Sequence, residues 1–288
     1  MAVLLAFLAA VAFAFGAVLQ QKGTLETSAG EGDARFLVQV LRRPVWLLGG
    51  LMQVLGWVLQ AVALDRGSLV VVQAVCALSL VIALPIGARL TAQRIGRREY
   101  VGALAATMGI VVFLAAGQPS GGTDQPSASA WWSASLLSLV IVSVAWTIAR
   151  HRSGSVAAVI YGSAAGICFG FQAAVTKVWV DSVGSGVVEL LGEWTTYALI
   201  ASALLGFVLQ QSALKTGILA PAMASSNALT LIASVAYGTT VFGETLGDGS
   251  GHQLASIVGL SSAVVGIVVL GRAQGPAIST PEPAVAAG

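Results

Sequence analysis

Long stretches without a single Asp, Glu, Lys or Arg constrain this sequence more than any other feature. Nine such runs occur, each of at least 21 residues: 1–21, 44–64, 67–88, 100–123, 125–149, 153–176, 194–214, 216–243 and 249–271. About 20 apolar residues suffice for a helix to cross the hydrocarbon core of a bilayer. The runs do not alternate with the period of two that a membrane β-barrel needs. The sequence therefore predicts an all-α, polytopic membrane protein with nine transmembrane helices.

The composition leaves little room for a soluble domain. Charged residues make up 9% of the 288 residues and apolar residues 57%, whereas soluble domains contain about 25% charged residues. A net charge of +2 that is spread along the chain gives no indication of a nucleic-acid partner. The two cysteines, Cys76 and Cys168, both lie inside apolar runs, so they predict neither a disulfide nor a metal site. We expect the lipid bilayer as the surrounding medium and no cofactor.

Lys and Arg residues lie mostly on one side of the expected spans. If the N-terminus is outside, every Lys and Arg except Arg66 and Lys177 falls on the cytoplasmic side. Cytoplasmic segments of membrane proteins carry such an excess of cations. We expect a multi-pass protein of the inner (plasma) membrane with an outer N-terminus and a cytoplasmic C-terminus.

Two segments of the chain recur later in the sequence. Residues 56–69 (GWVLQAVALDRGSL) return as 206–219 (GFVLQQSALKTGIL). Seven residues of 101–112 return 157 positions later, in 258–269: Val101, Gly102, Ala106, Gly109, Ile110, Val111 and Val112. These repeats predict two related halves, 1–117 with spans one to four and 153–272 with spans six to nine. Residues 118–152 would be a linker that contains span five, and 273–288 a disordered tail. Because equivalent spans lie five crossings apart, the halves enter the membrane in opposite directions, as in inverted-repeat transporters.

Amides and hydroxyls are the polar groups that the expected spans contain. Within the eighth span, polar residues recur at spacings of three, four and three, which places them on one face of a helix: Asn227, Thr230, Ser234 and Tyr237. Gln73 and Gln172 lie in the third and sixth spans. We expect these six residues to line a substrate site. The alternative is hydrogen bonding between helices, worth under about 2 kcal/mol per bond.

Three ionisable residues stand at the ends of spans. Lys22 and Lys177 end equivalent helices on opposite sides of the membrane, and Glu244 follows the eighth span. We expect these residues to act as gates that meet a substrate group in turn. Alternatively, they anchor helix ends at the membrane interface.

Several short motifs resemble those of the drug/metabolite transporter superfamily, which includes the EamA-like carriers. Phe169-Gly170 followed by Lys177 and Phe15-Gly16 followed by Lys22 look like the pattern that begins each repeat. Phe242-Gly243-Glu244 is similar to the Gly-Glu ending of the family's hairpin helix. Within the superfamily, the nine-span layout and the residues Gln21-Lys22-Gly23, Trp46 with Gly49, and Ala77-Leu78-Ser79 resemble the NIPA-type magnesium transporters. This resemblance implies an inverted-repeat helical carrier.

Three functions therefore stay open. The first is a secondary transporter that moves a small polar organic solute by alternating access. The second is a NIPA-type pathway for magnesium or another divalent cation, although the acidic residue that this branch carries in its second span is missing from 56–60. The third is a non-transporting scaffold or accessory subunit, and the ridge of Gly162, Gly166 and Gly170 also permits a homodimer. We expect no enzyme, because the sequence shows no nucleophile with a base, no paired carboxylates and no metal-ligand cluster.

Overall fold

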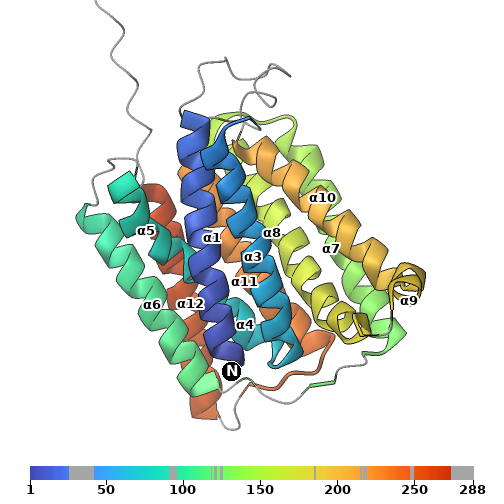
Figure 1. The fold of residues 1–288 in the computed structure, drawn as a ribbon. Helices are drawn as coiled ribbons and strands as arrows, with labels where there is room; N and C mark the ends of the chain where they lie inside the picture. Colours follow the sequence, from blue (N-terminus) through green and yellow to red (C-terminus); the bar gives the residue numbers. More distant parts are fainter. Residues whose placement is uncertain are drawn as a thin grey trace, which may run out of the picture.

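The protein is a bundle of long helices that run roughly parallel and antiparallel to one another (Figure 1). The computed structural model describes residues 1–25, 42–90, 96–117, 119, 122–123, 126–184, 186–214, 216, 219–246 and 250–273. The first half contains α1 (Ala2–Leu25), α3 (Pro44–Asp65), α4 (Leu69–Cys76), α5 (Ser79–Leu90) and α6 (Arg97–Gly117). Helix α7 (Ala128–Ala149) follows. The remaining elements are α8 (Gly154–Trp179), η1 (Val180–Ser182), α9 (Val187–Gly192), α10 (Trp194–Leu214), α11 (Leu219–Thr240) and α12 (Ser250–Ala273).

Eight stretches of helix are long and apolar enough to cross a membrane. They are Ala2–Gln20, Pro44–Asp65, Leu69–Leu90, Tyr100–Gly117, Ala128–Ala149, Val156–Ser182, Trp194–Ala213 and Ser250–Val269. The chain is thus a multi-pass helical membrane protein, as the charge-free runs predict. The expected eighth span corresponds to α11, which has 22 residues but is less apolar because it carries polar residues such as Asn227 and Thr230. That α11 is a ninth span stays a prediction, and the tail expected at 273–288 lies, apart from Ala273, outside the described residues.

The expected third span is interrupted. Ser68 caps α4 by accepting a hydrogen bond from the Val71 N–H at 3.1 Å. The helix tightens at its other end, because the Leu78 N–H bonds to the Val75 carbonyl at 3.1 Å, three residues back instead of four. A new helix, α5, then starts at Ser79. The third span is therefore present but consists of two helices, α4 and α5.

The repeated segments pack through equivalent positions. In the first half the ring of Phe13 rests on Gly56, so that an ideal Cβ on Gly56 would lie 2.6 Å from the ring. In the second half the ring of Phe169 rests on Gly206 in the same way, with 2.7 Å. These glycines recur because the facing helices, α1 with α3 and α8 with α10, approach closely at an aromatic ring.

Helices α6 and α12 cross backbone against backbone. An ideal Cβ on Gly109 would lie 2.7 Å from the Gly259 carbonyl oxygen, and one on Gly266 would lie 2.7 Å from the Gly102 carbonyl oxygen. Gly266 is the equivalent of Gly109 in the second half, and Gly259 is the equivalent of Gly102. One crossing therefore joins the two halves through small residues, which let helix backbones come close.

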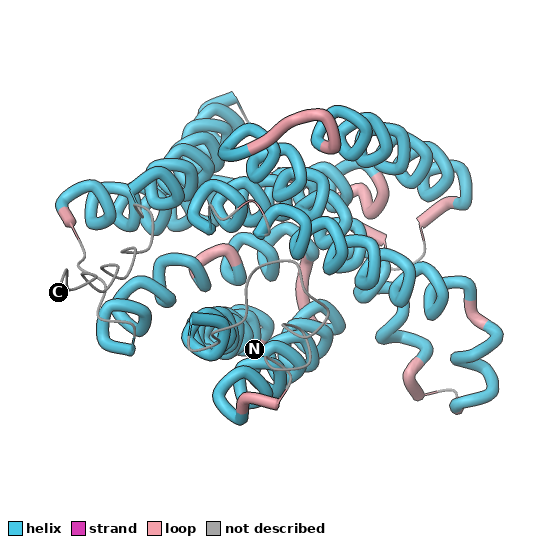
Figure 2. The backbone as a smooth tube through the Cα atoms, turned by 90° about the horizontal axis from the view of Figure 1, so that it is seen from above, coloured by secondary structure: helices cyan, strands magenta, loops and turns pink. Residues whose placement is uncertain are grey.

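The glycine ridge of α8 receives α11. Gly162 faces Ala222 and Ser225, and an ideal Cβ on Gly170 would lie 2.6 Å from the Cβ of Ala233. The ridge is thus covered by a helix of the same chain. Helix α4 contacts α1, α8 and α11. Figure 2 shows the bundle from above, with its helices joined by short loops.

Candidate functional site

The polar face of α11 packs mainly against protein. Ser234 is 0% exposed and Tyr237 is 4% exposed, and the Tyr237 hydroxyl bonds to the Ser138 hydroxyl of α7. Asn227 and Thr230 are half-buried. The Asn227 amide donates to the Met223 carbonyl at 2.9 Å and the Thr230 hydroxyl to the Ser226 carbonyl at 2.8 Å. These four residues thus share a face, with its last two members inside the packed core.

Two buried polar atoms near this face have no hydrogen-bond partner among the described residues. They are Gln73 Nε2 and Ser234 Oγ. The first turn of α4 meets the last turn of α11 where Val70 touches Gly238. Counting along both helices at 1.5 Å per residue from this contact places Gln73 and Ser234 within about 2 Å of the same depth. An unpartnered buried polar group is costly, so this level of the bundle can accept a further polar partner.

Gln172 lies on α8, whereas the polar face described above belongs to α11. Its side chain is half-buried, and its backbone carbonyl accepts a hydrogen bond from the Thr176 hydroxyl at 2.8 Å. The next residues of α8, Ala173 and Ala174, belong to the central core. The structure describes no hydrogen bond that joins the Gln172 side chain to the α11 face.

Two of the three expected gate residues meet at one turn of the first half. The Glu244 carboxylate is 3% exposed and accepts hydrogen bonds from the Leu69 N–H at 2.5 Å and from the Val70 N–H at 3.0 Å. These are the first two N–H groups of α4, which have no acceptor within their own helix. A carboxylate is favoured there because the N-terminus of a helix is electropositive. Glu244 therefore ties the segment after α11 to the start of α4.

Lys177 reaches the same turn from α8. Its Nζ donates a hydrogen bond to the Gly67 carbonyl at 3.0 Å and lies 5.7 Å from the centre of the Phe242 ring. We call the contacts of Lys177 and Glu244 with 67–70 the outer latch, because the distribution of Lys and Arg predicts that this end faces outward. Lys177 lies in the last turn of α8 and Glu244 follows α11, and both hold the turn between α3 and α4 of the first half.

Lys22 lies at the other end of the bundle. The neighbouring Gly23 packs against Trp46, where an ideal Cβ on Gly23 would lie 2.8 Å from the Trp46 Cβ. Trp46 stands at the start of α3, whereas Gly67 follows its end, and α3 is about 33 Å long. Lys22 and Lys177 therefore stand at opposite ends of the bundle, as the repeat predicts.

An aromatic cluster, which sequence reasoning did not identify, borders the outer latch. The Trp131 ring lies 5.9 Å from the Phe242 ring and 6.1 Å from the Phe171 ring, in edge-to-face arrangements that stabilise aromatic pairs. Phe171 in turn lies 5.7 Å from the Tyr237 ring. The available signal was the position of Trp131 at the start of an apolar run, where interfacial tryptophans are common.

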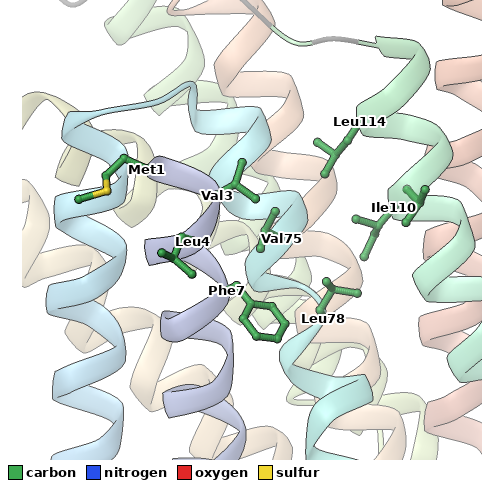
Figure 3. A pocket seen from close by; sticks show the side chains of 9 residues that line it. Met1, Val3, Leu4, Phe7, Val75, Leu78, Ile110 and Leu114 are labelled. Atoms are coloured by element: carbon green, nitrogen blue, oxygen red, sulfur yellow. The ribbon is translucent and has the colours of Figure 1, made fainter.

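A cavity of about 560 Å³ lies between α1, α4, α5 and α6. Its lining is apolar throughout: Met1, Val3, Leu4, Phe7, Val75, Leu78, Ile110, Val111 and Leu114. These residues come from α1, α4, the break after α4 and α6, and α5 only adjoins the cavity. Figure 3 shows Phe7, Leu78 and Leu114 converging on it from α1, from the break after α4 and from α6. None of the six expected substrate-site residues lines this cavity.

The described residues contain no group of three or more His, Cys, Asp or Glu side chains arranged to hold a metal ion. No family model matches the chain, and no solved structure matches it. The resemblance to the drug/metabolite transporters thus rests on the sequence motifs alone. The chain is 30% identical over 275 residues to a Corynebacterium glutamicum protein described as uncharacterized, and the alignment covers 94% of this chain and 95% of that protein. The chain belongs to the same family as this corynebacterial protein.

Proposed function

We propose that the protein is a secondary transporter that moves a small polar organic solute by alternating access. The observation that carries this proposal is the outer latch. A buried ionisable residue in a membrane protein is costly and is usually retained for function. Here Glu244 and Lys177 of the second half both hold the turn that opens an interrupted helix of the first half. Contacts of this kind can close one side of a transporter and release to open it.

The equivalent contacts in the two halves support inverted repeats. Phe13 on Gly56 corresponds to Phe169 on Gly206, and Gly109 with Gly259 corresponds to Gly266 with Gly102. Such repeats place a substrate between them and expose it alternately as one half rocks against the other. The α6–α12 crossing would then be the axis about which the halves move.

The break between α4 and α5 indicates where the solute would bind. Transporters often form their sites at interrupted helices, whose free backbone groups meet the substrate. Leu78 follows Val70 by eight residues and Thr230 precedes Gly238 by eight, so the break and Thr230 are each about 12 Å from the Val70–Gly238 contact. Asn227 and Thr230 are half-buried near the middle of α11. We assign the polar site to this level.

A second candidate is a scaffold or accessory subunit without a transport cycle. It is favoured by the complete burial of Ser234 and by the backbone-to-backbone contact of Gly109 with Gly259. Tight packing of this kind is what a static assembly needs. The two candidates differ in whether the outer latch opens.

Transport by the purified protein in proteoliposomes tests the proposal. A panel of labelled amino acids, amines, sugars and magnesium would be screened for uptake. Glu244→Gln is expected to change the rate of solute uptake. Glu193→Gln, at an exposed position before α10, is expected to leave the uptake rate unchanged. Equal rates for both variants refute the latch as a gate. A folded protein that moves no member of the panel supports the scaffold.

A further inference from the structure

The apolar cavity between α1, α4 and α6 lies in the first half, at the break after α4. An offset of 150 residues places Ser225 and Ala228 opposite Val75 and Leu78, and both are buried, at 8% and 2% exposed. Helix α11 packs directly on α12, while α4 and α5 touch α6 at few positions. The interruption at Ala77 and Leu78 thus leaves a space in one half that direct packing fills in the other.

The cavity opens toward the hydrocarbon of the bilayer. Its rim consists of exposed side chains on two spanning helices: Val3, Leu4 and Phe7 of α1 and Val111 of α6. Its floor consists of buried side chains, Val75 at 4% and Ile110 at 2% exposed. Apolar side chains on the rim of a spanning segment face lipid chains and not water. A ligand from the bilayer can therefore enter sideways, between α1 and α6.

The depth of the cavity matches one leaflet. Gly67 packs against Ala2, so α1 begins at the end of the bundle that carries the outer latch. From that end, Phe7 lies about 8 Å along α1 and Leu78 about 14 Å along the α4–α5 span. One leaflet of hydrocarbon is about 15 Å thick. The cavity thus occupies the depth that the chains of the leaflet at the latch end fill.

The chemistry of the lining selects the ligand. The volume of about 560 Å³ lies within the range of about 300–1,000 Å³ that is typical of small-molecule sites. The lining offers no polar side chain that could hold a head group or a polar solute, so the ligand is held by its hydrocarbon alone. We propose that the cavity binds an acyl chain of a bilayer phospholipid from the leaflet at the latch end. The chain fills the space between α4–α5 and α6.

Photo-crosslinking in lipid nanodiscs tests this proposal independently of transport. A phospholipid with a diazirine on one acyl chain is incorporated, and labelled residues are identified by mass spectrometry. Labelling of the buried Val75 and Ile110 above that of the exposed Leu137 on α7 is expected, since only a chain inside the cavity reaches them. Labelling confined to exposed residues such as Leu137 overturns the proposal.

Variants and a second probe sharpen the test. Leu78→Phe fills the cavity and is expected to abolish labelling of Ile110, whereas Leu137→Phe, its control on the lipid-facing side of α7, leaves that labelling intact. Melting temperatures of both variants verify folding, and the labelling pattern of the unaltered protein decides the matter if Leu78→Phe does not fold.

A free fatty acid with the same diazirine is the comparison for the source of the chain. If it labels Val75 and Ile110 more strongly than the phospholipid does, the assignment to a bilayer lipid is wrong.

Discussion

Removing the Glu244 carboxylate is expected to destabilise the protein in proportion to the hydrogen bonds lost. The carboxylate is 3% exposed and accepts from the Leu69 N–H at 2.5 Å and the Val70 N–H at 3.0 Å. A buried donor left without a partner costs about 1–3 kcal/mol. Glu244→Ala leaves two such donors and is expected to lower the free energy of unfolding by about 4 kcal/mol. Glu244→Gln keeps one acceptor oxygen, and its cost is expected to be about 2 kcal/mol.

Thermal unfolding of the detergent-purified protein, followed by tryptophan fluorescence, measures this order. The melting temperature is expected to fall from the unaltered protein to Glu244→Gln and further to Glu244→Ala. Glu193→Gln serves as control, because Glu193 is exposed and surface substitutions usually change stability by less than about 0.5 kcal/mol. If Glu244→Ala melts like the control, the carboxylate does not hold α4. If Glu244→Gln costs as much as Glu244→Ala, the argument from the remaining acceptor is wrong.

Two further predictions concern the helix crossing and the proposed solute site. Gly109→Ala and Gly266→Ala each place a Cβ 2.7 Å from a carbonyl oxygen of the facing helix; they are expected to cost about 1–3 kcal/mol each and to lower the melting temperature equally. Gly251→Ala, where nothing lies within 4 Å, should not destabilise, and a Gly109→Ala protein that melts like Gly251→Ala contradicts the tight crossing. The double variant Asn227→Leu with Thr230→Val is expected to abolish uptake of the transported solute in proteoliposomes, and unchanged uptake removes the proposed site.

Much of the helical layout could be predicted from the charge-free runs. Burying a charge in hydrocarbon is so costly that Asp65, Arg150 and Lys177 mark the ends of spans closely. Helix α3 ends at Asp65 and α7 at Ala149. The repeated Gly56 has a packing reason that the sequence did not show, because a side chain at this position would collide with the Phe13 ring.

The helix break could not be predicted. Ala77 has φ −62° and ψ −19°, which any residue adopts, and neither Gly nor Pro stands at the break to signal it. Pro85 lies further along, inside α5. The break is a shift in backbone hydrogen bonding that depends on how α4 and α5 pack against different neighbours. Local sequence carries no signal for such a tertiary effect.

The backbone partners of Glu244 and Lys177 in the outer latch could not be predicted from the sequence either. Glu244 bonds to Leu69 across 175 positions and Lys177 to Gly67 across 110. Sequence reasoning could identify both as ionisable residues at span ends, but not that they meet at one turn. The two donors and the one acceptor on that turn belong to the backbone, which every residue shares. Only the fold shows which N–H groups remain unpaired.

The two ends of the bundle differ in a way that bears on the transport proposal. The offset of 150 residues places Arg94 opposite Glu244 in the sequence, and Arg94 lies outside the described residues. A cation is disfavoured at a helix N-terminus, so the sequence predicts a different closure at the end opposite the latch. Under the transport proposal, a structure with the latch formed is the state closed at the Gly67 end. If Glu244→Gln weakens the latch by about 2 kcal/mol, the equilibrium shifts toward opening at that end by about 30-fold. Under the transport proposal, this one carboxylate sets the resting balance between the two faces.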